Sequence, residues 1–332
     1  MVRRLLVGLA ALVLTVSQSA NAVMVALSAA SSGAVSSGAS GTGHDALWLG
    51  HAWIDGRKSQ SDVDEMVTLL RNTGVRDLFV HAGPFNNDGT LDPALRVRAG
   101  GFVDSVHAAL PGVRVQAWLG AHPRPDQLHL WSPATRQRVL TAVGRVLDDG
   151  FDGIHYDFEP IGDGDEYLLA MLTETRPLTR DRHAVLSVSA IHTEPWSGLA
   201  ACLRVLPAAL SLWSGDYLHR VAKLVDQVAV MAYDTGLPAR DAYTGYVRRA
   251  TALALAAVPA DVGLLIGVPT YDEPGLYHHP RAETLAAALR GVRLALRADP
   301  PAREFGVALY VDFTTTPDEW ATYREHWSDP TG

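Results

Sequence analysis

The feature that most constrains the fold is an unbroken alternation, from about residue 44 onward, of short β-type runs and longer helical patterns. The β-type runs lie at 46–53, 77–81, 113–120, 153–159, 185–191, 227–233, 263–271 and 306–313. The helical segments lie at about 60–73, 95–109, 134–148, 165–175, 212–224, 241–257, 282–297 and 317–326. Strand–helix pairs that alternate in this way and in this number predict a single closed (β/α)₈ TIM barrel, spanning 44–332, rather than an open sheet.

The first 43 residues are typical of an exported chain. Arg3 and Arg4 precede an apolar run at 5–16, and Ala20-Asn21-Ala22 has the small-x-small pattern of a cleavage site, which predicts a signal peptide at 1–22. The run is short for a membrane-spanning helix, which needs about 20 residues. The alternative is an uncleaved anchor that also includes 23–27. Such an anchor is the only contact with a membrane that the sequence predicts.

Residues 23–43 are expected to form an Ala/Ser/Gly-rich linker. Within it, 31–43 contains only Ser, Gly, Ala, Thr and one Val, a composition that predicts a flexible tether. The protein is therefore expected to be secreted or extracytoplasmic, with its folded domain beginning at about His44.

Composition and spacing exclude several classes of partner. A formal net charge of −8 argues against nucleic acid, since phosphate binding needs clustered Lys and Arg. Cys202 is the only cysteine and has no internal disulfide partner. Neither a paired-histidine metal spacing nor a phosphate-binding glycine motif is present, so we expect no metal and no cofactor. We also expect a monomer. His278 and His279, in a polar loop after the seventh strand, are expected at the surface.

Strand alternation assigns side chains to the inside or the outside of the predicted barrel. In the fourth strand, the apolar face of Ile154, Tyr156 and Phe158 must contact the helices, so His155, Asp157 and Glu159 point inward. By the same reasoning Val307, Leu309 and Val311 of the last strand point outward. The inward candidates on the other strands are His81, Gln116, Trp118, Ser187, Ser189, Met231, Tyr233, Pro269, Tyr271, Tyr310 and Asp312. The first strand is ambiguous, since Trp48 and Trp53 fall on opposite faces.

The ionisable row on the fourth strand ends where barrel active sites lie, at the carboxyl end of the strands. Burying charge costs several kcal/mol per ion, so the row indicates either chemistry or a structural polar network. Asp157 and Glu159 are two residues apart, with Cα atoms about 6.6 Å from each other, and therefore lie side by side rather than on opposite faces of a sugar ring. The neighbouring carboxylate would raise the pKa of Glu159 and keep it protonated as a general acid. Asp157 would then orient a substrate that supplies its own nucleophile.

Two motifs resemble those of glycoside hydrolase family 18, the chitinase-like family. The family signature DGxDxDxE corresponds to Asp152-Gly153-Ile154-His155-Tyr156-Asp157-Phe158-Glu159, and the motif MxYD to Met231-Ala232-Tyr233-Asp234. The resemblance extends in order and spacing over 46–327. It implies a retaining glycosidase that acts on N-acetylated amino sugars of a polysaccharide or glycan.

The resemblance also implies roles for single residues. Glu159 corresponds to the proton donor, and Asp157 to the residue that orients the substrate's 2-acetamido group. Tyr233 corresponds to the hydroxyl that binds the acetamido oxygen, and Asp234 to a sugar-binding acid. The remaining candidates for substrate binding are His155, Trp118, Tyr271, Tyr310, Asp312 and Met231.

Two departures from the family pattern indicate a divergent member rather than a standard chitinase. His155 replaces the middle aspartate of the signature, and Tyr310 with Asp312 stands where the family has a tryptophan on strand eight. Asp157 beside His155 would favour the imidazolium, which predicts an imidazole titration on the alkaline side of the activity profile. Two alternatives remain open: a non-catalytic sugar-binding barrel, and a glycosidase of another family whose second carboxylate is the more distant Asp312 or Asp272.

Overall fold

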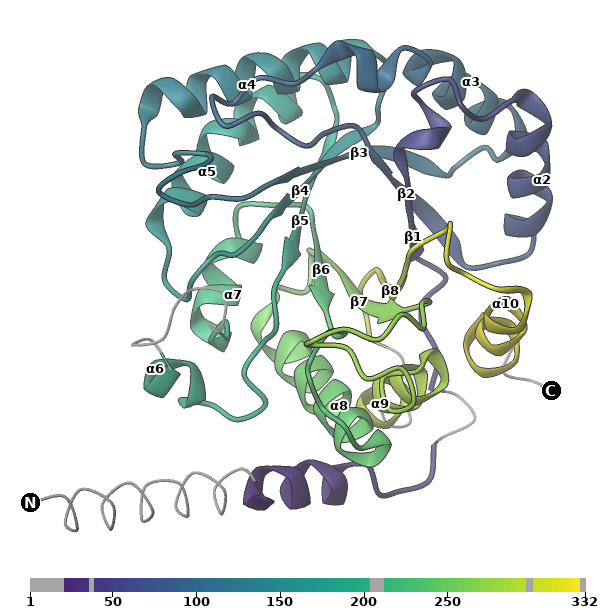
Figure 1. Cartoon of the computed structure of the whole chain (residues 1–332), viewed down its shortest axis with the longest axis vertical. Coiled ribbons are helices and arrows are strands. Elements are labelled where there is room, and N and C mark those ends of the chain that lie inside the picture. Colours follow the sequence, from purple (N-terminus) through teal and green to yellow (C-terminus); the bar gives the residue numbers. More distant parts are fainter. Residues whose placement is uncertain (1–20, 36–38, 204–211, 297–300, 329–332) are drawn as a thin grey trace, which may run out of the picture.

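The computed structural model describes residues 21–35, 39–203, 212–296 and 301–328. Eight parallel strands form a closed barrel in chain order, and β8 pairs with β1 (Figure 1). The predicted (β/α)₈ barrel is confirmed. Its strands are β1 Asp45–Leu49, β2 Val75–His81, β3 Arg114–Ala121, β4 Gly153–Phe158, β5 Val185–Ala190, β6 Gln227–Met231, β7 Gly263–Pro269 and β8 Phe305–Tyr310.

Helices surround the barrel and alternate with its strands (Figure 1). They are α2 Gln60–Leu70, α3 Ala99–Ala109, α4 Pro133–Asp148, α5 Glu166–Asp181, α6 Leu199–Leu203, α7 Gly215–Ala222, α8 Arg240–Ala257, α9 Leu285–Leu296 and α10 Pro317–Tyr323. Short one-turn helices occur at His51–Trp53 (η1), Pro93–Arg96 (η2) and Arg324–Ser328 (η4). The start of α10 is set locally, because Thr316 and Glu319 form a capping box.

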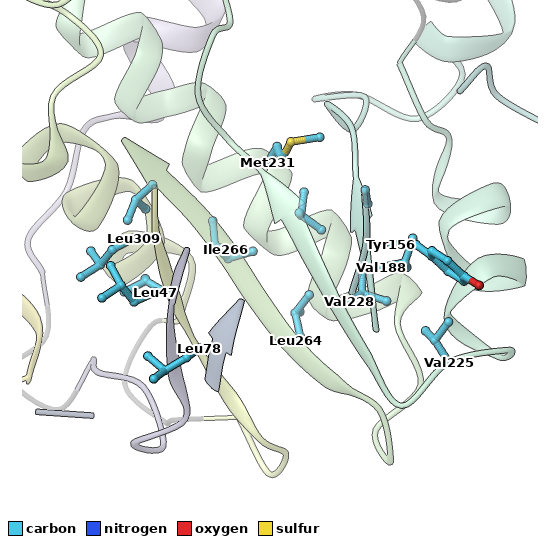
Figure 2. Close-up of a cluster of buried hydrophobic side chains, with 14 of the residues drawn as sticks. Leu47, Leu78, Tyr156, Val188, Val225, Val228, Met231, Leu264, Ile266 and Leu309 are labelled. Atoms are coloured by element: carbon cyan, nitrogen blue, oxygen red, sulfur yellow. The ribbon is translucent and has the colours of Figure 1, made fainter. Parts of the chain in front are cut away.

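An outer core fills the space between barrel and helices. Ile154, Tyr156 and Phe158 are buried in it, as the alternation of β4 predicts. Figure 2 shows Tyr156 beside Val188 of the neighbouring β5, with Val228 of β6 in the same cluster. This apolar face of β4 therefore points to the helices, which leaves its opposite face for the barrel interior.

An inner core occupies the barrel itself. It consists of Ala46, Trp48, Phe79, Trp118, Ala229, Leu265, Ala308 and Val311. Trp48 is thus the inward residue of β1, while Trp53 lies beyond the strand in η1. Val311 was expected outside, and that expectation is wrong because β8 ends at Tyr310, so the strand alternation does not extend to the next residue.

The segment before the barrel packs against α8 and α9 (Figure 1). Residues 21–30 are helical, and Leu27 is 2% exposed. A Cβ on Gly245 would lie 1.8 Å from the Leu27 carbonyl oxygen, so this close approach requires glycine in α8. Arg248 donates to the carbonyl of Ala30 (2.8 Å), and Arg290 and Arg293 donate to carbonyls further along the segment.

These contacts differ from the flexible tether that the composition predicts. Small side chains bury little area, but arginines on the helices bind the backbone carbonyls, which every residue has. The apolar run at 5–16 lies outside the described residues, so the signal peptide and its cleavage stay predictions. Among the residues that the structure describes, no helix is long and apolar enough to cross a membrane.

We expect the docked segment to contribute to stability. Leu27→Ala should lower the free energy of unfolding by about 2 kcal/mol, at the lower end for buried leucines because the helix lies at the periphery. The matched control is Val25→Ala on the same helix, 70% exposed, which should change it by less than about 0.5 kcal/mol. Urea unfolding of the purified protein measures both, and equal effects would contradict the docking.

Candidate active site

The end of β4 places Asp157 and Glu159 together at the carboxyl end of the barrel. The Glu159 backbone N–H donates to Ala121 of β3 (2.9 Å), which continues the strand pairing by one residue. Asp157 accepts a hydrogen bond from the indole N–H of Trp118 at 2.8 Å. Trp118 is only 8% exposed, so it positions Asp157 rather than offering an open stacking surface.

The environment of the two carboxyl groups favours the neutral acid at Glu159. Burial, the negative charge of Asp157 and a hydrogen bond to Asp157 together raise the pKa of Glu159 well above its usual value, and the charge of Asp234 adds to this. Burial also raises the pKa of Asp157, while hydrogen bonds from Trp118, Glu159 and Ser189 oppose the shift. Glu159 therefore holds the proton at neutral pH and donates it toward Asp157.

Tyr233 follows β6 and lies close to this pair. Its ring stacks on Tyr310 at 5.0 Å, and a Cβ on Gly267 of β7 would lie 2.9 Å from it, so the glycine provides the space for the ring. Burial raises the pKa of Tyr233 far above its ordinary value, with contributions from the charges of Asp157 and Glu159. The phenol is therefore a hydrogen-bond donor at any ordinary pH. Met231, the last residue of β6, is buried in the core.

Asp234 is held in a left-handed backbone conformation, with φ of 55°. Its carboxylate accepts a hydrogen bond from the Tyr271 hydroxyl at 2.5 Å. Tyr271 lies just after β7, and its ring packs on His278 at 4.4 Å. The side chain of Asp234 is 47% exposed, so it remains available to a ligand.

Tyr310 takes the position for which the family resemblance implies a tryptophan. Its ring contacts those of Trp48 (5.6 Å), Trp118 (6.0 Å), Tyr233 and Tyr271 (6.0 Å). This half-buried ring is the centre of an aromatic floor beside the carboxyl pair, which suits the apolar face of a sugar.

A cavity of about 470 Å³ extends from the pair toward the loops after β2 and β3. Its lining includes His81, Phe85, Asn87, His122, Gln127, Asp157 and Glu159. Such a volume suits a small ligand or a sugar unit. Asn87, His122 and Gln127 were not among the sequence candidates, because they lie in loops without a periodic pattern.

The expected pairing of His155 with Asp157 is wrong. His155 is fully buried, and its ring nitrogens contact the hydroxyls of Ser187 (2.7 Å) and Ser189 (2.9 Å) on β5. Its ring also stacks on Phe79 at 3.8 Å. Burial lowers the pKa of His155 to about 3, so the imidazole is neutral and does not reach a ligand in the cleft.

We therefore expect no imidazole step from His155 in the pH profile. His155→Gln, which can still bond one serine, should reduce stability but leave both limbs of kcat/KM against pH where they are. The measurement is the pH profile of both proteins on one substrate, and a limb that moves in the variant would contradict a neutral, structural His155.

Asp312 does not act as an opposing carboxylate in the cleft. Its two oxygens accept hydrogen bonds from the Gly50 backbone N–H (2.9 Å) and the Trp53 indole (2.7 Å), because β8 ends before it and the chain turns toward η1. Asp272, the other candidate, is exposed in the loop after β7.

His278 was expected at the surface, but it is 3% exposed, since the loop folds back beneath Tyr271.

Solved structures with the same fold include chitinases and a spore cortex-lytic enzyme. The Bacillus cereus spore cortex-lytic enzyme SleL matches with a TM-score of 0.59 and 12% identity, over 86% of this chain and 74% of that one. A class V chitinase from Pseudomonas fluorescens matches with 0.56 and 13%, over 85% and 99%. A chitinase from Chromobacterium violaceum matches with 0.53 and 14%, over 85% and 98%. The chain shares the barrel fold of these proteins.

No protein-family model matches the chain, and no curated protein sequence does. At these identities the structural likeness shows the fold alone. The chemistry of the site must therefore be argued from its own residues.

Proposed function

We propose that this chain is a retaining glycoside hydrolase that cleaves glycosidic bonds of N-acetylated amino sugars in a polysaccharide or glycoconjugate. The observation on which this rests is the buried pair of Asp157 and Glu159, in which Glu159 keeps its proton at neutral pH. A barrel that only binds sugar does not require a proton donor, so a protonated acid beside a second carboxylate favours catalysis. The shared fold of the chitinases and SleL supports the proposal.

The geometry suits a substrate-assisted reaction. Glu159 protonates the glycosidic oxygen as its bond to the anomeric carbon breaks, and the carbonyl oxygen of the substrate's acetamido group bonds to that carbon. Asp157 accepts the acetamido N–H and balances the charge of the cyclic intermediate, while the Tyr233 hydroxyl donates to the carbonyl oxygen. Water then attacks the anomeric carbon as the bond to the acetamido oxygen breaks, and a proton of the water passes to Glu159, with net retention of configuration.

The test is a screen of the purified protein against labelled chitooligosaccharides, peptidoglycan fragments and galactosaminoglycans. We expect cleavage of at least one class, with retention at the anomeric carbon in early NMR spectra. Binding without cleavage of any class would instead favour the sugar-binding barrel, and inversion would reject the substrate-assisted reaction.

We also propose that the protein is exported by its N-terminal segment. Mass spectrometry of the protein recovered from outside the cytoplasm should give an N-terminus at about residue 23. An intact Met1 on that material would favour an uncleaved anchor.

A further inference from the structure

Three ionisable side chains from two segments converge beside Tyr271. Asp234 follows β6, whereas His278 and Glu283 belong to the loop between β7 and α9. His278 Nδ1 lies 3.3 Å from Asp234 Oδ1 and 3.7 Å from Glu283 Oε2. One ligand atom from each residue lies within 4.8 Å of the other two.

Two of these groups are almost completely buried and have polar atoms without a hydrogen-bond partner. His278 is 3% exposed and Glu283 is 1% exposed. Within the described part of the chain, the two ring nitrogens of His278 have no hydrogen-bond partner, and Oε1 of Glu283 has none either. Since buried polar atoms in folded proteins are nearly always satisfied, this arrangement indicates a ligand.

The neighbouring residues fix the three side chains in place. Glu283 Oε2 accepts the backbone N–H of Thr235 at 3.1 Å, which orients its carboxylate toward His278. The Tyr271 hydroxyl holds Asp234, and its ring packs against the imidazole. The cluster is therefore built from side chains whose positions are already determined by other contacts.

A proton on His278 would balance the charge of this cluster only in part. Nδ1 bears a single hydrogen, and neither carboxylate is placed to accept it with hydrogen-bond geometry. A cation placed between the three side chains would face all three ligand atoms, which lie within 4.8 Å of one another.

The spacing fits a transition-metal ion. Tetrahedral ligands at 2.0–2.1 Å from zinc lie about 3.4 Å from one another, close to the two distances from His278 Nδ1. One imidazole and two carboxylates are ligands of zinc-type ions, whereas calcium and magnesium prefer oxygen alone. We propose that Asp234, His278 and Glu283 bind one divalent cation of the zinc class, which links the loop after β7 to the end of β6.

The proposal does not depend on the hydrolysis proposed above, and its test measures binding. The protein is stripped with chelator and titrated with ZnCl₂ by calorimetry, with CaCl₂ and MgCl₂ in parallel. We expect about one zinc per chain, a Kd of about 1 μM or tighter, and a zinc-dependent rise in Tm. Absence of saturable zinc binding, or a preference for calcium or magnesium, would overturn the proposal.

Variants locate the site. His278→Ala and Glu283→Gln should each weaken zinc binding at least about tenfold. The matched control His279→Ala, a neighbour whose side chain lies outside the cluster, should bind zinc as the parent does. If His278→Ala does not fold, Glu283→Gln decides alone, because it keeps its size and an acceptor for Thr235. Unchanged affinity in Glu283→Gln, or an equal loss in His279→Ala, would place zinc elsewhere and reject the site.

Discussion

Glu159→Gln is expected to lower kcat by about 10²–10⁴-fold while ligand affinity stays within a few-fold. The amide has the size of the acid and can still donate to Asp157, so the site keeps its shape. It has no proton to transfer to the leaving oxygen. The measurement is steady-state hydrolysis of whichever substrate the screen identifies, together with ligand binding by calorimetry.

The control for this variant is Glu166→Gln, the same chemical change on the exposed surface of α5, where Glu166 pairs with Arg220. It should leave kcat and KM unchanged. A loss below about tenfold in Glu159→Gln would mean that another group protonates the leaving oxygen, and the acid would have to be sought elsewhere in the cleft.

Asp157→Asn is expected to lower kcat by about 10²–10³-fold and to move the alkaline limb of the pH profile to lower pH. The rate falls because an amide cannot balance the charge of the intermediate. The limb moves because the charge of Asp157 and the hydrogen bond to it both raise the pKa of Glu159. Without them Glu159 ionises at lower pH, and the protonated acid is lost earlier as pH rises.

Asp312→Asn provides the matched control, since it makes the same change in a carboxylate that binds Gly50 and Trp53 instead. It should reduce the free energy of unfolding by about 1–3 kcal/mol, because one N–H loses its acceptor, and leave the alkaline limb in place. The measurement is kcat/KM against pH for the parent, Asp157→Asn and Asp312→Asn. A limb that stays fixed in Asp157→Asn would refute the coupling between the two carboxyl groups.

Much of the fold follows from patterns that are local in the chain. The alternation of β-type and helical segments predicts the barrel, because side chains alternate between the two faces of a strand, whereas those on one face of a helix recur about every 3.6 residues. The same alternation correctly orients Tyr156 outward and places Asp157 and Glu159 at the carboxyl end of β4. Tyr233 could be predicted as their neighbour only with the help of the family resemblance.

The tertiary structure decides what depends on strand ends, register and loops. β8 ends at Tyr310, so Asp312 turns to Gly50 instead of entering the cleft. The register of β4 with β5 sets His155 opposite Ser187, and a buried imidazole with neutral partners stays neutral.

The docking of the N-terminal segment and the cluster around His278 also depend on contacts between distant parts of the chain. Small residues at 31–35 dock because arginines on α8 and α9 bind their carbonyls, a contact between positions more than 200 residues apart. Asp234 and Glu283 approach His278 only when the loop after β7 folds back onto the end of β6. Local periodicity determines which residues form strands and helices, but contacts between distant segments arise only when the barrel closes, and the sequence contains no local pattern for them.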